Sequence, residues 1–367
     1  MRPARAEALP GWFRDEALPL WRGAGVDREG FGVFEALDHE GRPLPQTPKR
    51  LRVQLRQVFV LATASRIWGT GDLKLAEALF AAVLERGFEP GSGALASLMA
   101  RDGTILAAPH DLYDVAFLLL AEAALKRAGA APGETGAAAL ARLRAPRGWR
   151  ERLGEPAIPR GQNAHMHLFE AATAKAEAGD EAWLSVAEEC LALFRGAFLG
   201  PDGAVREFFD ADWRPLSAGQ RVEPGHVAEW IVLIDHWERL TGRASGVDLA
   251  PLWRFVERET GADGLLPDAS EPREESRRLW PQTERFRAAR VAARRLGAAE
   301  DLSALPFAPY LATPAPGGWF DRLDASGRVT SSVMPASTAY HIALACLAEM
   351  DHQGAATRKK RDRRPEP

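Results

Sequence analysis

The chain has 367 residues, of which 46% are hydrophobic and 26% are charged, and its formal net charge is −3 at pH 7. This composition is typical of a globular protein with a large core, and the nearly balanced charge argues against a nucleic-acid or anionic-membrane partner. No apolar run approaches the roughly 18 residues of a membrane span, and the N-terminal "MRPARAEALPGWF" lacks the apolar stretch of a signal peptide. Cys190 and Cys346 lie in Ala/Leu-rich helical patterns, so we expect buried, reduced thiols and a cytoplasmic protein.

Helical periodicity extends over most of the chain. It predicts twelve helices, near residues 7–22, 50–68, 73–87, 112–129, 134–145, 163–178, 181–198, 226–242, 248–260, 281–296, 299–312 and 337–350. We expect residues 1–353 to form a single domain. The remaining segment, 354–367, ends in the basic "TRKKRDRRPEP" and is expected to be a disordered, solvated tail.

Alternate helices in this series begin with polar or titratable residues and continue with an apolar stretch. The residues that mark these starts are spaced 53 to 59 positions apart: Arg56, Asp114, His167, His226, Glu284 and His341. Three connecting segments, 34–44, 207–216 and 321–330, each have the residues of a short β-hairpin, so one hairpin is predicted to occur three times. Such spacing indicates an internal repeat.

Six repeats of helix–loop–helix can close into a ring with six inner and six outer helices. Closure buries the apolar faces that a single helix pair would leave exposed. The sequence therefore predicts an all-α (α/α)6 barrel, a toroid with short hairpins in its loops, in which the polar helix starts surround a central pocket.

The segment "RVEPGHVAEW" (221–230) places a histidine at the start of one inner helix. Glu229 lies three residues after His226 and shares its helix face, while Pro224 and Gly225 allow a sharp entry of the backbone. Taken alone, the segment has a second interpretation: a carboxylate at the helix N-terminus interacts with the helix dipole, and the histidine is an ordinary surface residue. Its position in the repeat favours a pocket residue.

In "NAHMHLFEAA", Asn163, His167 and Glu170 share one helix face. His165 points roughly 200° away from His167 on an ideal helix, so it is expected to pack in the core. His110 and His236 are interpreted as structural residues.

The other helix starts add an arginine, an imidazole and an indole. Arg56 precedes a long apolar stretch, His341 heads the last helix, and Trp280 stands before Glu284 in "RLWPQTE". An individual Trp usually packs in a core and an arginine at a helix start is usually solvated. Together, histidines, carboxylates, one arginine and aromatic faces suit a neutral polyhydroxylated ligand. Histidine can move a proton next to a carbonyl near neutral pH, and Arg56 can stabilise the resulting oxyanion.

Four motifs, "NAHMHLFEA", "EPGHVAEW", "RLWPQTE" and "STAYHIAL", resemble those of the N-acylglucosamine 2-epimerase family, which includes mannose isomerases and cellobiose 2-epimerases. The resemblance extends from about Arg52 to His341. It implies an (α/α)6 barrel and metal-independent chemistry through a cis-enediol, without a cofactor.

The resemblance also implies roles for individual residues. His226 and His341 would be the two acid/base histidines, His167 the conserved histidine of the third motif, Arg56 the contact to the enediolate, and Glu229 the helix-borne glutamate. The residues expected to bind substrate are Asn163, Trp280, Glu284, Asp114 and Tyr113. The sequence departs from relatives at Val115, where a polar residue is frequent.

The predicted function is therefore that of a sugar isomerase that converts an aldose into its ketose, D-mannose into D-fructose or lyxose into xylulose. The alternative is a 2-epimerase of N-acylglucosamine or of cellobiose-type disaccharides. The expected partner is a monosaccharide, and the protein is expected to be a monomer or a homodimer.

Two other classes of enzyme stay open. Glu223 paired with Glu229 or Glu284 suits a glycoside hydrolase on the same fold. A zinc site built from His165, His167, His226 and Glu229 is a further alternative, although His165 and His167 diverge on a helix. A non-catalytic sugar-binding role would leave the histidines without a purpose.

Overall fold

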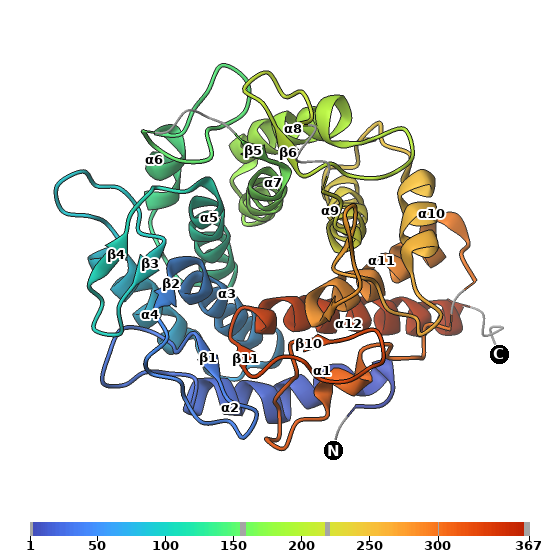
Figure 1. Cartoon of the computed structure of the whole chain (residues 1–367), viewed down its shortest axis with the longest axis horizontal. Coiled ribbons are helices and arrows are strands. Elements are labelled where there is room, and N and C mark those ends of the chain that lie inside the picture. Colours follow the sequence, from blue (N-terminus) through green and yellow to red (C-terminus); the bar gives the residue numbers. More distant parts are fainter. Residues whose placement is uncertain (1–2, 155–158, 217–220, 300, 363–367) are drawn as a thin grey trace.

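Six helices surround the centre of the molecule in a closed ring (Figure 1). The computed structural model describes all residues except 1–2, 155–158, 217–220, 300 and 363–367. Each ring helix packs against the next in chain order, and the last packs against the first. These inner helices are α3 (Leu51–Trp68), α5 (Leu112–Arg127), α7 (Gln162–Glu177), α9 (Pro224–Thr241), α11 (Leu279–Leu296) and α12 (Thr338–Asp362).

Shorter helices cover the outside of this ring (Figure 1). The N-terminal helical segment packs outside α12, and the other outer helices pack against the inner helix that precedes each of them. The N-terminal segment consists of α1 (Leu9–Trp12) and α2 (Leu18–Gly23), which are joined by a π-helical stretch, η2 (Phe13–Ala17). The other outer helices are α4 (Leu73–Arg86), α6 (Thr135–Ala141), α8 (Leu184–Leu193) and α10 (Leu249–Glu259). Short 3-10 or π turns complete the helical elements: η1 (Ala6–Ala8), η3 (Glu181–Trp183), η4 (Phe194–Phe198) and η6 (Ala308–Leu311). This arrangement is consistent with the predicted (α/α)6 barrel.

One predicted helix is wrong. Within the described part of segment 299–312, the helical residues are only those of the turn η6. Pro306 and Pro309 lie in this segment, and proline cannot donate the backbone hydrogen bond that continues an α-helix. The described residues therefore place five outer helical segments, rather than six, around the inner ring. At the C-terminus, α12 continues to Asp362, so residues 354–362 extend the helix, and 363–367 lie outside the described residues.

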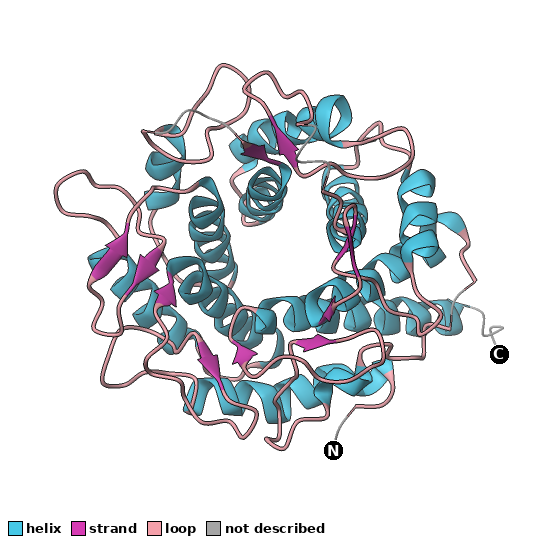
Figure 2. Cartoon of the chain, viewed as in Figure 1, coloured by secondary structure: helices cyan, strands magenta, loops and turns pink. Residues whose placement is uncertain are grey.

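Short antiparallel strands cap one end of the ring (Figure 2). Four of them, β2, β5, β9 and β11, immediately precede the inner helices α3, α7, α11 and α12. The paired strands are β1 (Ala36–Leu37) with β11 (Met334–Pro335), β2 (Lys49–Arg50) with β3 (Leu98–Met99) and β3 with β4 (Ile105–Ala107), β5 (Arg160–Gly161) with β6 (Phe208–Phe209), β7 (Ala269–Ser270) with β8 (Arg273–Glu274), and β9 (Arg277–Arg278) with β10 (Arg322–Leu323).

The predicted threefold repeat of one hairpin is confirmed. Leu37 bridges Pro43, Phe209 bridges Pro215, and Leu323 bridges Val329. Each turn begins with an aspartate: Asp38, Asp210 or Asp324. Its Oδ1 atom accepts a hydrogen bond from the backbone N–H of the arginine four residues later. The first strand of each hairpin pairs with the residues just before α12, α7 or α11. The repeat thus holds the starts of three inner helices at one end of the ring.

The sequence of the inner helices explains why they lie inside. In α5 every residue from Leu112 to Leu125 except Tyr113 is buried, as expected for a helix that is apolar on all sides. Cys190 and Cys346 are buried free thiols, in agreement with the sequence. Among the described residues, no helix has both the length and the apolar character to cross a membrane.

A buried ion pair closes the ring between its last two helices. The Arg290 side chain on α11 donates through Nε to the Glu349 carboxylate on α12 at 3.0 Å, and both side chains are only 4% exposed. Arg290 also donates to the carbonyl oxygen of Leu302, in the segment that replaces the missing outer helix. One arginine therefore joins α11, α12 and the proline-rich connection.

Substituting Glu349→Ala is predicted to lower the free energy of unfolding by about 3–5 kcal/mol, because it leaves a buried arginine without its carboxylate. Urea unfolding followed by circular dichroism measures the change. The matched control is Glu188→Gln, which removes the exposed pair with Arg243 and is expected to cost about 0–1 kcal/mol. An equal, small effect of both substitutions would contradict a closing role for the buried pair.

Candidate active site

The first two turns of the inner helices bring their polar side chains together inside the ring. His226 on α9 forms a hydrogen bond through Nδ1 with Oε1 of Glu207 at 2.8 Å. The other oxygen of Glu207 accepts a hydrogen bond from Gln162 at 3.0 Å, and Gln162 in turn accepts one from the Trp230 indole. A buried chain of hydrogen bonds therefore holds the His226 ring in place.

The electrostatic surroundings favour a charged His226. Burial alone lowers the pKa of an imidazole, but the hydrogen bond and charge of Glu207, together with the charge of Glu223, outweigh it and raise the pKa of His226 to about 9. This ring is accordingly an imidazolium near neutral pH, and it can donate a proton.

Sequence reasoning missed Glu207. A signal for it exists in the repeated hairpin, because an acidic residue stands directly before the first strand each time, as Glu35, Glu207 and Asp321. Their carboxylates form hydrogen bonds with side chains: Glu35 with Arg50, Glu207 with His226, and Asp321 with Thr338. The repeated acidic position thus fastens a hairpin to an inner helix or to the residue before one.

His341 on α12 has the opposite charge preference. Its Nδ1 lies 2.7 Å from Oε1 of Glu284, whose other oxygen forms an ion pair with Arg287. Burial, together with the charges of Arg56, His167 and Arg287, lowers the pKa of His341 well below its ordinary value. The ring is therefore neutral, with Nδ1–H donating to Glu284, and its Nε2 can accept a proton.

Trp280 brings the two histidines into one site. Its ring centroid lies 4.9 Å from that of His226 and 5.5 Å from that of His341, and the indole is half-buried. This packing requires a glycine at the start of α9, because a Cβ at Gly225 would lie 2.7 Å from the indole ring. Two imidazoles with opposite charge preference therefore pack against one indole.

A third imidazole and an arginine occupy the neighbouring sectors. His167 Nδ1 lies 3.0 Å from Oε2 of Glu170, and the other oxygen of Glu170 accepts a hydrogen bond from the Tyr340 hydroxyl. Burial lowers the pKa of His167. Arg56 donates to the Tyr113 hydroxyl at 2.8 Å, and its guanidinium lies over the Phe117 ring at 4.4 Å. Its charge is therefore held in place by aromatic rings and has no carboxylate partner among the described residues.

Glu229 lies between these groups with its carboxyl unpaired. It is 1% exposed, and neither oxygen has a hydrogen-bond partner within the described part of the protein. Burial and the charges of Glu284 and Glu170 raise its pKa well above the ordinary value, which favours the protonated form of this carboxyl. Its oxygens lie within 4.8 Å of ligand atoms of His167 and Glu170, and also of Glu284 and His341. Either set has the ligand types of a metal site.

The predicted substrate-binding residues divide into two groups. Tyr113 and Asn163 are half-buried beside the histidines: the Tyr113 ring lies 5.0 Å from that of His167, and the Asn163 Oδ1 atom is buried without a partner in the described residues. Asp114 is different, because its carboxylate accepts the backbone N–H and the side chain of Arg52. The structure uses Asp114 to join α5 to α3.

The other histidines behave as the sequence predicts. His165 packs beside Trp149 and Trp213, its nitrogens bond backbone groups, and burial lowers its pKa to about 4. His110 likewise bonds the backbone of Leu95 and Ala139. The alternative zinc site is therefore not formed, because His165 packs in the core, away from the other proposed ligands.

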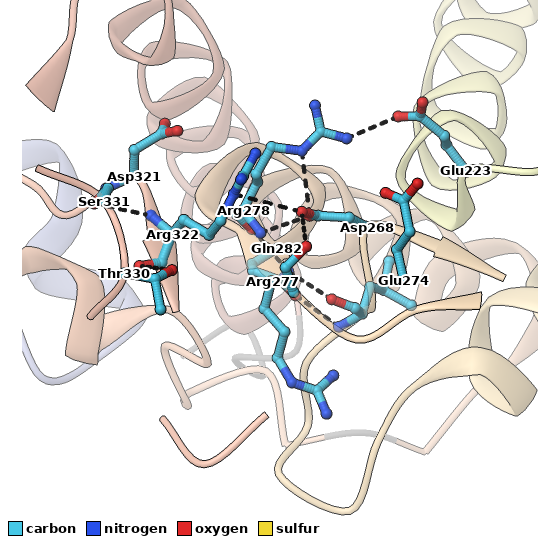
Figure 3. A network of polar contacts seen from close by, with 12 residues as sticks. Glu223, Asp268, Glu274, Arg277, Arg278, Gln282, Asp321, Arg322, Thr330 and Ser331 are labelled. Atoms are coloured by element: carbon cyan, nitrogen blue, oxygen red, sulfur yellow. Dashed lines mark hydrogen bonds and ion pairs between the residues drawn. The ribbon is translucent and has the colours of Figure 1, made fainter. Parts of the chain in front are cut away.

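Ion pairs connect the rim of the site between α9 and α11. Figure 3 shows Arg278 between Glu223, at 3.0 Å, and Asp268, at 3.2 Å. Arg221 pairs with Glu223 at 2.8 Å and with Glu274. Each of these two arginines is thus neutralised by carboxylates.

Comparison with known proteins identifies the family of the chain. The sequence profile of the N-acylglucosamine 2-epimerase (GlcNAc 2-epimerase) family matches residues 32–345. The chain belongs to this family. A mannose-6-phosphate isomerase of Rhizobium meliloti (strain 1021) is 36% identical, with 95% of this chain and 97% of that protein aligned.

Solved structures of family members share the fold. A D-mannose isomerase superposes with a TM-score of 0.83 at 19% identity, covering 95% of this chain and 97% of that one. The cellobiose 2-epimerase of Spirochaeta thermophila DSM 6192 superposes with a TM-score of 0.82 at 20% identity, covering 96% and 97%. At these identities the likeness supports the helical-barrel fold, and it does not distinguish the two activities.

The His226–Glu207 pair generates a measurable prediction. His226 is expected to titrate near pH 9 in NMR spectra, and Glu207→Gln is expected to lower that value by about 1–3 units, since an opposite charge nearby is removed. Because the folded-state pKa exceeds the unfolded value, the pair stabilises the fold fully below about pH 6.5, and this contribution is lost as the pH rises through about 9. The control is Glu274→Gln at the rim, which should leave the titration of His226 unchanged. An unshifted pKa in Glu207→Gln would contradict the assignment.

Proposed function

We propose that this protein is an aldose–ketose isomerase that converts D-mannose into D-fructose through a cis-enediol. The observation that carries the proposal is the pair His226 and His341, which contact the same indole and have opposite charge preferences. An enzyme that moves a proton next to a carbonyl needs an acid and a base in one pocket, and environments that separate two pKa values supply them.

The first step of the proposed reaction opens the sugar ring. The His226 imidazolium donates a proton to the ring oxygen as the C1–O5 bond breaks, and the neutral imidazole then takes the proton of the C1 hydroxyl. The protonated Glu229 donates a hydrogen bond to a sugar oxygen, since its own carboxyl has no protein partner. The product is the open aldose.

The second step moves hydrogen from C2 to C1. Neutral His341 removes the C2 proton through Nε2, the C–H electron pair forms the C1–C2 double bond, and O1 gains the negative charge. Arg56 stabilises that oxygen, and His167, whose Nδ1–H donates to Glu170, accepts a hydrogen bond from a sugar hydroxyl through Nε2. The C2 hydroxyl then passes its proton to O1 as the C2 carbonyl forms, and His341 returns its proton to C1. The ketose and the original enzyme result.

Similarity to known proteins supports isomerisation over epimerisation. The relative that is 36% identical bears the name of a mannose-6-phosphate isomerase, whereas the solved D-mannose isomerase and cellobiose 2-epimerase are equally distant, at 19% and 20% identity. The rim supports a sugar without a phosphate, because Arg221, Arg278 and Arg52 already have carboxylate partners.

Incubating the protein with D-mannose in deuterated water tests the reaction. The expected product is fructose that carries deuterium at C1, detected by NMR, with mannose 6-phosphate converted more slowly than free mannose. Labelled glucose as the sole product would defeat the proposal and favour the 2-epimerase alternative, for which N-acylglucosamine and cellobiose are the next substrates to assay. Faster turnover of the phosphorylated sugar would overturn the choice of a neutral substrate.

Substituting His341→Asn should lower kcat at least about 100-fold, because it removes the base of the enolisation step. The matched control is His236→Asn, at the other end of the ring, which should retain full activity. The same experiment addresses the glycoside-hydrolase alternative, which depends on carboxylates and not on His341. Retained turnover in His341→Asn would exclude the proposed proton transfer. The alternative pair is already weakened in the structure, since Glu223 forms ion pairs with two arginines.

A further inference from the structure

A second cavity lies at the opposite end of the ring from Trp280. It has a volume of about 340 Å³ and is lined by residues of the later turns of the inner helices, whereas the histidine site uses the first turns. Arg66, near the end of α3, and Arg127, the last residue of α5, lie at its opening together with Glu177 and His236. Nothing in the proposed reaction uses these residues.

A layer of buried charges separates this cavity from the histidines. Glu170 and Arg287 line the cavity, and the same two side chains hold His167, Tyr340 and Glu284. The two sites are therefore back to back, with one charged layer between them.

Apolar side chains form one half of the cavity lining, and charged or polar side chains form the other half. Phe59, Leu120, Leu233 and Leu344 form part of its wall, and they offer no partners for sugar hydroxyls. A cavity of this size and lining is typical of a small-molecule site. A ligand with an apolar part therefore fits the apolar half of this lining better than a sugar does.

Two arginines at this end of the cavity, the partly buried Arg127 and the exposed Arg66, share the charge of one glutamate, Glu177. The Glu177 carboxylate is occupied by Arg127 at 2.7 Å and by His236 at 3.4 Å. Arg66 has no hydrogen bond or ion pair within the part of the chain that the structure describes, and partial burial and the charge of Arg127 lower its pKa. Asp351 also lines the cavity, but it lies on α12 without an ion pair to Arg66. An anion bound beside Arg66 would therefore form an ion pair with a guanidinium that has no other ion pair among the described residues.

We propose that this cavity binds a small organic anion, a carboxylate or phosphate group attached to an apolar body of about the size of a benzene ring. A dry apolar cavity of about 150 Å³ is enough to hold benzene, so the volume here has room for both parts. The apolar body lies against Phe59 and the leucines, and the anionic group lies beside Arg66 and Arg127.

Calorimetric titration of the full chain tests this site with four probes: benzoate, phenyl phosphate, benzyl alcohol and inorganic phosphate. The two aromatic anions are expected to bind at least about tenfold more tightly than benzyl alcohol, which lacks the charge, and than inorganic phosphate, which lacks the apolar body. Preference for benzoate or for phenyl phosphate identifies the anionic group. Equal binding of benzyl alcohol, or no binding of either aromatic anion, would overturn the proposal.

Two variants locate the binding. Arg66→Gln is expected to weaken both aromatic anions about tenfold, whereas Arg254→Gln, an exposed arginine on α10 outside the cavity lining, should leave them unchanged. Ala174→Trp fills the cavity and should abolish binding while circular dichroism shows a folded protein. Saturating D-mannose should not displace the anions. Displacement by mannose would assign them to the histidine site and overturn this inference without affecting the proposed isomerase activity.

Discussion

Three hydrogen bonds between a glutamate and an imidazole Nδ1 determine what the centre of this ring can do. Glu207, Glu284 and Glu170 each hold one histidine at 2.7 to 3.0 Å. Every bond fixes the orientation of its ring and leaves Nε2 for other partners. The bonds are alike, but the neighbours of each pair differ, so His226 is charged while His341 is neutral. His165, two residues before His167 in α7, bonds backbone groups instead and packs in the core.

The three glutamates come from different kinds of element, so the site requires the whole ring. Glu207 precedes a hairpin strand, whereas Glu170 and Glu284 lie on α7 and α11. The strand that follows Glu207 pairs with the residues before α7, which places its carboxylate between α7 and α9. The Arg290–Glu349 pair joins α11 to α12, the helix that carries His341. A local loss of closure would therefore separate the acid from the base.

Charge is distributed unequally along the axis of the molecule. At the histidine end, rim arginines are neutralised by carboxylates, the Glu229 carboxyl has no hydrogen-bond partner among the described residues, and Arg56 lies against aromatic rings. At the other end, Arg66 lies at a half-apolar cavity and has no ion pair within the described part of the chain. The layer of Glu170 and Arg287 belongs to both ends. A neutral polar ligand suits the first environment, and an apolar anion suits the second.

The sequence by itself determined the inner helices, the repeated hairpin and the choice of His167 over His165, because helical period and turn chemistry are local properties of a chain. Eleven of the helical segments follow from that period. The helix predicted at 299–312 does not form, because the prolines at 306 and 309 interrupt its apolar pattern. Only the tertiary structure decided which residues hold the imidazoles and how they are charged. Glu207 is 19 residues from His226, and Glu284 is 57 residues from His341. A pKa depends on burial and on charges a few ångströms away, and those distances exist only after the ring has closed.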